Sequence, residues 1–381
     1  MKSFDIKTKI YFGDQALDRL AEIPYQKVLI VTDPFIAQGD LIDLVTQPLK
    51  KGNKQFEIFK DVVPDPPIEK ISEGVRKMLE YRPDAIVAVG GGSAIDSSKS
   101  IREFALRVDH YGEVGLIAIP TTSGTGSEVT SFAVVTDPAA KVKYPLVSYS
   151  MMPDEAILDA ELVKSVPPAV TADTGMDVFT HALEACVSIN RSDFSNALAE
   201  KAIEICGVFL LRAYLDGSDM HARQKMHSAS CLAGLAFNTA SLGLNHGMAH
   251  QLGATFHIPH GRANAMLLPH IIEFNSDINK HSKSRETYLP AVKRYATVAQ
   301  ILGLSSYNKI MTVRSLVNWV QFMLKEMDIP LSISQIGTIS ENEYFGAIDR
   351  MADAALADAC TATNPRVPSK DDVIRIYKAL W

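Results

Sequence analysis

The first part of the chain alternates short β-branched and apolar runs with stretches of helical periodicity. Strands are expected at residues 27–32, 55–59, 85–89 and 116–119, and helices at 36–50, 68–81 and 94–106. This βαβα alternation predicts a parallel, doubly wound sheet. Two further runs, 132–136 and 142–148, flank Asp137-Pro138 and are typical of a hairpin.

The pattern changes after the proline pair Pro167-Pro168. From residue 169 to residue 381, Leu, Ala and Met recur at helical spacing and β-branched runs are few. This periodicity predicts an all-helical second part. We therefore expect an α/β domain over residues 1–167 and an all-α domain over residues 168–381.

Residues 4–11 alternate apolar and polar side chains, as an edge strand does. Because an edge strand offers unpaired backbone groups, this segment favours a homodimer that pairs such edges. The alternative is an edge strand that pairs within one subunit.

Composition and charge exclude several classes of protein. The chain has 381 residues, 47% hydrophobic and 22% charged, with a net charge of −6 and no block of Lys and Arg, so we expect no nucleic-acid partner. Its apolar runs fall short of the roughly 20 residues of a membrane span, so we expect no membrane partner. Its four cysteines form no CxxC pair, which favours a reducing compartment and hence the cytoplasm.

Two glycine-containing loops follow strands of the predicted sheet. The run 85–89 leads into Gly90-Gly91-Gly92-Ser93 and then a helix, a turn whose backbone amides can approach a diphosphate. The run 116–119 leads into a loop rich in Gly, Ser and Thr at residues 120–127. Both loops lie at the carboxyl edge of the sheet, where such sheets bind ligands. The alternative for the first loop is a tight turn without a ligand.

An acidic residue, Asp33, ends the first predicted strand of the sheet. Its carboxylate can accept hydrogen bonds from both ribose hydroxyls of NAD, and it would repel the additional phosphate of NADP. The alternative is that Asp33-Pro34 only opens a turn.

The helical part gathers residues that can ligate a metal. Asp177 and His181 are one helical turn apart, as are His246 and His250, while His260 is expected in a loop. A single histidine at such a place is usually only hydrogen-bonded, but these residues occur together in one apolar domain. Imidazoles with one carboxylate suit Fe(II), Zn or Ni, and the lack of thiolates disfavours a structural zinc site.

With these motifs in place, the chain resembles the iron-dependent (group III) alcohol dehydrogenases over essentially its whole length. The matching strings are GGGSAIDSSK (90–99), IPTTSGTGSEVT (119–130), TGMDVFTHALEA (174–185), LNHGMAHQLGATFHIPHGRANA (244–265) and TNPR (363–366). The resemblance implies a dehydroquinate synthase-like architecture, NAD as cofactor, and Fe²⁺, with Zn²⁺ or another divalent ion as the alternative.

The resemblance also assigns roles to individual residues. The implied metal ligands are Asp177, His181, His246 and His260, and the implied catalytic residue beside the nicotinamide is His250. The implied NAD contacts are Asp33, Gly91, Gly92, Ser93, Thr121, Thr122, Thr125, Thr130 and Lys143. The implied substrate pocket contains Phe132, Phe237 and Cys360.

These roles imply hydride transfer between NAD(H) and a small primary alcohol or aldehyde such as ethanol, propanol or propanal. One alternative is a glycerol or diol dehydrogenase. A second is a lyase of the dehydroquinate synthase type, which requires several Lys and Arg around its substrate, whereas the motifs here carry few. A third is a non-catalytic scaffold, which the complete ligand set disfavours. The resemblance implies a place in the cytoplasm or inside a bacterial microcompartment.

Overall fold

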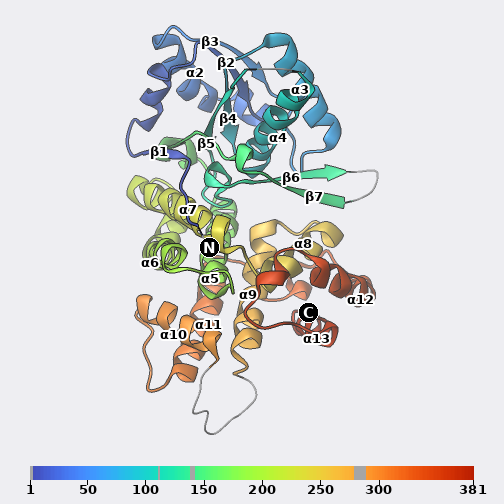
Figure 1. Ribbon diagram of the computed structural model, residues 1–381. Coiled ribbons are helices and arrows are strands. Elements are labelled where there is room, and N and C mark those ends of the chain that lie inside the picture. Colours follow the sequence, from blue (N-terminus) through green and yellow to red (C-terminus); the bar gives the residue numbers. More distant parts are fainter. Residues whose placement is uncertain (1–2, 110–111, 138–141, 279–288) are drawn as a thin grey trace. The chain divides into compact units, whose positions relative to one another are not determined.

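The computed structural model describes residues 3–109, 112–137, 142–278 and 289–381. The chain divides into two compact units, Met1–Ser165 and Val166–Trp381. The first, which we call the α/β unit, contains the sheet, and the second, the helical unit, consists of helices (Figure 1). The expected fold class is therefore confirmed. Within the described residues, no helix has both the length and the apolar character needed to cross a membrane.

The α/β unit is built on a sheet of six parallel strands in the order β1-β8-β5-β4-β2-β3. These strands are β1 (Lys9–Phe12), β2 (Lys27–Val31), β3 (Gln55–Phe59), β4 (Ala85–Gly90), β5 (Gly115–Pro120) and β8 (Glu155–Leu158). A separate antiparallel hairpin consists of β6 (Phe132–Asp137) and β7 (Val142–Val147). The N-terminal strand β1 is an edge strand that pairs with β8 of its own chain.

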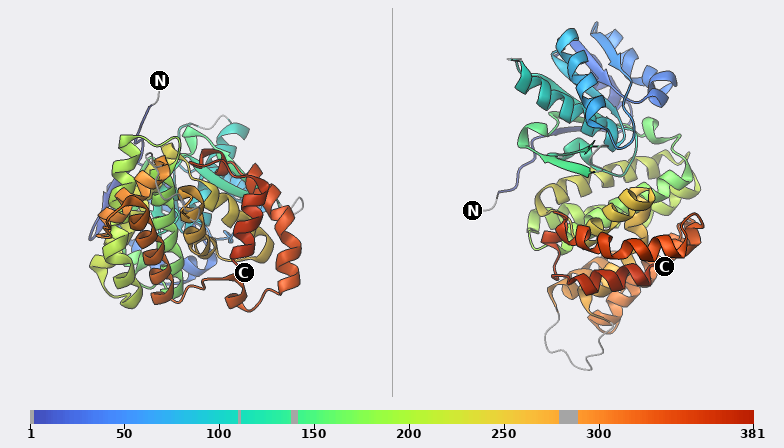
Figure 2. Two further views of the ribbon diagram at one scale, coloured as in Figure 1. Left: turned by 90° about the horizontal axis from the view of Figure 1, so that it is seen from below. Right: turned by 90° about the vertical axis from the view of Figure 1, so that its right-hand side faces the viewer.

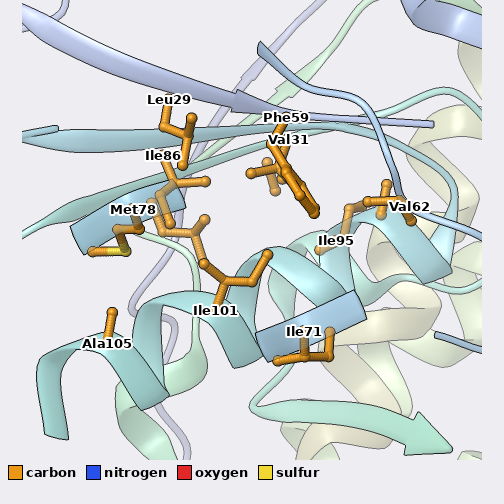
Figure 3. Packing of buried hydrophobic residues seen from close by; sticks show 14 of the residues in the cluster. Leu29, Val31, Phe59, Val62, Ile71, Met78, Ile86, Ile95, Ile101 and Ala105 are labelled. Atoms are coloured by element: carbon orange, nitrogen blue, oxygen red, sulfur yellow. The ribbon is translucent and has the colours of Figure 1, made fainter. Parts of the chain in front are cut away.

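Helices cover both faces of the sheet, because successive side chains of a strand point to opposite sides. On one face, α3 (Ile68–Tyr81) and α4 (Gly92–Val108) pack against a cluster that includes Leu29, Val31 and Ile86 (Figure 3). On the other face, η1 (Ala16–Ala21), α1 (Pro34–Gln38) and α2 (Leu41–Lys51) pack against Val28 and Ile30. The central strands are thus buried on both sides, as in other doubly wound sheets.

The direction in which strands are added reverses at β2. The chain passes from β2 outward to β3 and then returns to β4 on the opposite side of β2. The carboxyl ends of β2 and β4 therefore flank the topological switch point, where sheets of this type bind ligands. Asp33 follows β2, and Gly91 follows β4.

Several elements differ from the sequence prediction. The edge strand expected over residues 4–11 is confined to Lys9–Phe12. The single helix expected over residues 36–50 is divided into α1 and α2, because Gly39 leaves the helix with an extended backbone (φ −98°, ψ 177°). The strand β8 was not predicted, since its four residues EAIL form too short a run to show a period.

The helical unit contains nine α-helices among its described residues. They are α5 (Pro168–Val187), α6 (Asp193–Leu215), α7 (Met220–Ala240), α8 (Leu244–Phe256), α9 (His260–Ser276), α10 (Pro290–Ile301), α11 (Lys309–Glu326), α12 (Glu341–Ala357) and α13 (Lys370–Ala379). Helix α5 packs against α6, α7 and α9, and its residues are buried along most of its length. Helices α12 and α13 lie side by side (Figure 2), where the Tyr344 hydroxyl donates to the Tyr377 carbonyl at 2.9 Å.

Replacing Ile101 by alanine should destabilise the α/β unit by about 2–5 kcal/mol, because it leaves a cavity between α4, α3 and the sheet. Ile101 is fully buried in the cluster shown in Figure 3. The control is Val108→Ala at the end of the same helix, where Val108 is 71% exposed and the change should stay within about 0.5 kcal/mol. Urea unfolding followed by circular dichroism measures both, and equal effects would contradict this packing.

Candidate metal centre

One face of α5 carries two carboxylates and an imidazole. Asp177, His181 and Glu184 follow one another at intervals of four and three residues, so their side chains lie on successive turns of the same face. All three side chains are buried. A buried face of this kind requires partners from neighbouring helices, because an unpaired buried charge is costly.

Helices α8 and α9 bring two further imidazoles to this face. His246 lies on α8, and His260 is the first residue of α9 rather than a loop residue as expected. Asp177, His181, His246 and His260 each present one ligand atom, and these four atoms all lie within 4.8 Å of one another. Asp177 Oδ1 is 3.8 Å from His246 Nε2 and 3.6 Å from His260 Nε2. The structure thus brings together the four residues that the resemblance assigned to a metal.

The glycine after His260 allows α9 to begin against the backbone of α5. A Cβ at Gly261 would lie 2.1 Å from the Asp173 carbonyl oxygen and 3.2 Å from Asp177 Cβ. Any larger residue would push the first turn of α9 away from α5 and would carry His260 with it. The close approach of the two helices therefore sets the position of His260 relative to Asp177.

Asn264 lies one turn after His260 and contacts three of the four side chains. Its Nδ2 is 2.8 Å from Asp177 Oδ1 and 3.1 Å from Nε2 of both His246 and His260. The amide of Asn245 donates to Asn264 Oδ1 at 2.9 Å and to the Asn264 carbonyl at 3.0 Å. These bonds fix the orientation of the Asn264 amide, so that its nitrogen faces the potential metal-ligand atoms of Asp177, His246 and His260.

Glu184 holds His246 from the opposite side. Its Oε2 lies 2.5 Å from His246 Nδ1, and its Oε1 accepts the backbone N–H of Asn245 at 2.8 Å. Burial raises the pKa of Glu184 to about 8. Burial and the neighbouring imidazoles keep the pKa of His246 well below its ordinary value. His246 is therefore not an imidazolium at neutral pH, and one of its ring nitrogens keeps a lone pair.

A clamp near the C-terminus holds the helices behind this site. Asn364 Oδ1 accepts the backbone N–H of Leu244, the first residue of α8, at 3.2 Å. The amides of Asn364 and Asn275 also bond to each other, at 2.7 and 3.2 Å, and Asn275 lies near the end of α9. The TNPR segment thus fixes the start of α8 relative to the end of α9.

His250 lies beside the four-residue cluster without belonging to it. Its ring stacks on that of His260, with 5.4 Å between centroids and an interplanar angle of 18°. Its Nδ1 is 2.8 Å from Asp358 Oδ2. Although burial acts in the opposite direction, the hydrogen bond with His250 keeps the pKa of Asp358 below its ordinary value. Asp358 Oδ2 therefore accepts a hydrogen bond from His250 Nδ1, and in the neutral form of the ring this leaves the lone pair on Nε2.

Two of the three residues expected in a substrate pocket also lie near these imidazoles. Phe237 of α7 packs against His181, with 4.7 Å between ring centroids and an interplanar angle of 30°. Cys360 belongs to a second potential ligand group with His250 and Asp358. The third residue, Phe132, begins β6 in the α/β unit.

The expected cofactor loops are in contact with each other in the α/β unit. The backbone N–H of Thr121 donates to the Gly90 carbonyl at 3.1 Å, and a Cβ at Gly92 would lie 2.8 Å from Thr125 Cγ2. Gly91 is the N-cap of α4 and provides no side-chain cap. The N-terminus of α4, with Ser93 in its first turn, therefore opens beside the second loop, which contains Thr122.

Asp33 uses one carboxylate oxygen for the fold and directs the other toward the glycine loop. Its Oδ1 accepts the backbone N–H of Ile36 at 3.0 Å and so caps α1. Its Oδ2 lies 3.8 Å from the position of a Cβ on Gly90. The turn role weighed as an alternative is thus present, and it leaves a second oxygen available.

A buried lysine, Lys99, ties the second loop to α4. Its ammonium donates to Ser127 Oγ at 2.9 Å, Thr130 Oγ1 at 3.1 Å and the Phe132 carbonyl at 2.7 Å. Burial lowers the pKa of Lys99 to about 8, so it remains mainly protonated at pH 7. Thr130 is buried and its hydroxyl is engaged in these bonds. The side chain of Lys143, another expected NAD contact, lies outside the described part of the structure.

Sequence reasoning missed Glu184, Asn264, Asp358 and Lys99. For Glu184 a signal existed, because it follows His181 by three residues on the face that carries Asp177. Asn264 likewise follows His260 by four residues. Asp358 had no local signal, since its partner His250 is distant in the sequence.

Comparison with known proteins covers nearly the whole chain. Residues 7–160 match the family described as iron-containing alcohol dehydrogenase, and residues 171–381 match the C-terminal part of the Fe-containing alcohol dehydrogenase family. The 1-propanol dehydrogenase PduQ of Citrobacter freundii is 43% identical over 96% of both chains. This agrees with a likeness to 1-propanol dehydrogenases of propanediol utilisation that residues 143–146 and 192–202 suggest.

Two further proteins that are similar to this chain are named for other small alcohols. The NADPH-dependent butanol dehydrogenase of Clostridium saccharobutylicum is 37% identical and covers 100% of this chain and 98% of its own. A solved 1,3-propanediol oxidoreductase superimposes with a TM-score of 0.90 at 30% identity over 100% of both chains. With both family regions matched and such relatives aligned from end to end, the chain belongs to the iron-containing alcohol dehydrogenases and is an oxidoreductase that acts on small alcohols.

Proposed function

We propose that the chain transfers hydride between NAD(H) and a small primary alcohol or aldehyde, with one divalent cation held by Asp177, His181, His246 and His260. The observation that carries this proposal is the convergence of one carboxylate and three imidazoles within 4.8 Å. The names of the relatives, a propanol and a butanol dehydrogenase, support a short unbranched substrate.

The four side chains suit a divalent cation. The Asn264 amide nitrogen carries two hydrogens, whereas three atoms with lone pairs lie within 3.1 Å of it, Asp177 Oδ1 and Nε2 of His246 and His260. Three lone-pair atoms that converge on one amide nitrogen are also placed so that they could share one cation. Three imidazoles and a carboxylate match Fe²⁺ or Zn²⁺ and are unsuited to Mg²⁺ or Ca²⁺, which prefer oxygen ligands. Iron is the metal in the name of the family.

A bound divalent cation would polarise the substrate oxygen and favour its deprotonated form. The residues of the chain perform the remaining tasks. We infer that His250 accepts or returns the substrate proton at Nε2, because Asp358 holds its Nδ1–H. Phe237 forms an apolar wall beside His181, and we propose that Cys360 lines the same short pocket. The expected part of Phe132, which lies in the α/β unit, remains a prediction.

The α/β unit supplies the elements of an NAD site. The N-terminus of α4, with Gly91, Gly92 and Ser93, favours a diphosphate through its dipole and free amides. We propose that Thr121, Thr122 and Thr125 bind the cofactor from the second loop, and the expected NAD contact of Lys143 remains a prediction. We propose that Thr130 supports the cofactor site indirectly, because its hydroxyl accepts a hydrogen bond from Lys99.

Asp33 favours NAD over NADP, although one relative is named for NADPH. Its Oδ2 is not used in capping α1 and can accept hydrogen bonds from a ribose. A 2′-phosphate at the same position would meet a carboxylate of like charge. A homodimer and a place in the cytoplasm or a bacterial microcompartment, both expected from the sequence, remain predictions.

Removal of the metal tests the proposal directly. Protein treated with a chelator under anaerobic conditions should oxidise 1-propanol with NAD about a hundredfold more slowly or worse, and added Fe²⁺ should restore the rate. NADH absorbance with ethanol, 1-propanol, glycerol and 1,3-propanediol ranks the substrates. Full activity without metal, or a strong preference for glycerol, would contradict the proposal.

Replacing Glu184 by glutamine should weaken metal binding by about 10- to 100-fold, because an amide cannot supply both oxygens, one on His246 Nδ1 and one on the Asn245 N–H. Competition between the protein and a chromogenic chelator for Zn²⁺ measures the affinity. The control is Glu204→Gln on α6, where the exposed carboxylate pairs only with Lys201 among the described residues. An unchanged affinity in Glu184→Gln would show that this carboxylate does not support the ligand.

Replacing Asp33 by serine should reduce kcat/KM with NAD by about tenfold or more and increase kcat/KM with NADP, because a carboxylate that binds the ribose is lost. Serine caps a helix as well as aspartate does, so stability should change little. Asp40→Ser is the matched control, since Asp40 precedes α2 and makes no side-chain cap bond. If the ratio of kcat/KM with NAD to kcat/KM with NADP stays the same, Asp33 does not determine the cofactor preference.

A further inference from the structure

A second group of potential ligands lies beside the four-residue cluster and shares no residue with it. His250, Asp358 and Cys360 each present one ligand atom, and these three atoms lie within 4.8 Å of one another. His250 comes from α8, whereas the other two follow the end of α12. We propose that these three residues form a separate binding site for a soft divalent cation, with Zn²⁺ as the fitting ion.

The donor set differs in kind from that of the first site. One thiol, one imidazole and one carboxylate match the preference of zinc, while the first site contains nitrogen and oxygen donors only. Tetrahedral zinc with bonds of about 2.0–2.3 Å places its donors roughly 3.3–3.8 Å apart. Small side-chain rotations would bring the three atoms into this range.

The local structure holds the donors in place. Asp358 Oδ1 accepts the backbone N–H of Cys360 at 2.9 Å, which fixes the turn that carries both residues. Asp358 Oδ2 faces His250 Nδ1 at 2.8 Å. Among the described residues, no Lys or Arg forms an ion pair with this carboxylate, which instead faces the His250 imidazole. The His250 side chain is 38% exposed, so an ion can reach it from solvent.

Binding can be written so that protons balance. The cation replaces the proton on His250 Nδ1, and Nε2 takes up a proton, so the ring remains neutral. Cys360 Sγ loses its proton to solvent and binds as a thiolate, so one proton is released for each cation. Because His250 Nε2 is then protonated, it can no longer accept a proton from a substrate. Occupation of this site would therefore inhibit an enzyme that uses His250 in proton transfer.

Cobalt distinguishes the two sites, because a thiolate ligand gives Co²⁺ a charge-transfer band in the near ultraviolet and nitrogen or oxygen ligands do not. Full-length apoprotein titrated with Co²⁺ should show this band with the second equivalent, and Zn²⁺ should abolish it. The band should be absent in Cys360→Ser. It should persist in Cys206→Ala, whose thiol is buried in α6.

A second measurement uses the wild-type protein alone. Zn²⁺ should slow the alkylation of Cys360 at least about tenfold, as read by mass spectrometry of the labelled peptide. The visible spectrum of the first Co²⁺ equivalent reports binding to the four-residue cluster. A lack of binding there can therefore be distinguished from a lack of binding at the second site. The inference is overturned if excess Co²⁺ gives no thiolate band, if the band survives in Cys360→Ser, or if Zn²⁺ leaves the alkylation rate unchanged.

Discussion

The helical unit depends on the way His246 is held between two buried groups. Glu184 contacts one ring nitrogen at 2.5 Å, and Asn264 contacts the other at 3.1 Å. With both nitrogens engaged, the ring cannot turn without losing a bond in a place where water cannot replace it. The positions of Asp177 and His260 are then set by the same asparagine, so one amide aligns donors from three helices.

In the α/β unit, too, one buried polar side chain orders the surrounding loop, and here it is the cation of Lys99. Lys99 has three hydrogens and three acceptors, so its buried ammonium is fully satisfied. Those acceptors are Ser127 at the end of the second loop, Thr130 shortly after it, and Phe132, the first residue of β6. A single cationic side chain thus fixes the loop that faces the N-terminus of α4. In both units, a buried polar side chain positions the residues that we propose to contact a ligand. Those residues themselves form few of the hydrogen bonds that order the site.

Much of the fold could be predicted from the sequence, because periodicity and turn residues were clear. The bounds of β3 and α3 match the expected runs, whereas the division between α1 and α2 depended on the conformation of Gly39. Ligand candidates could be recognised as pairs one helical turn apart. Glu184 shares a helical face with His181 and so left a signal, but its contact with His246, like that of Asp358 with His250, depends on tertiary packing and could not be assigned from the sequence. The engagement of Thr130 by Lys99 was hidden for the same reason.

The clamp made by Asn364 has a consequence for how the protein is completed during synthesis. All four residues of the cluster have been made once residue 260 has been added, but Asn364, which joins the start of α8 to Asn275 of α9, comes more than a hundred residues later. A ribosome that stopped in between would release a chain with every ligand and without the bonds that hold two of the ligand-bearing helices in register. The position of these ligands therefore depends on a residue that is added long after the ligands themselves.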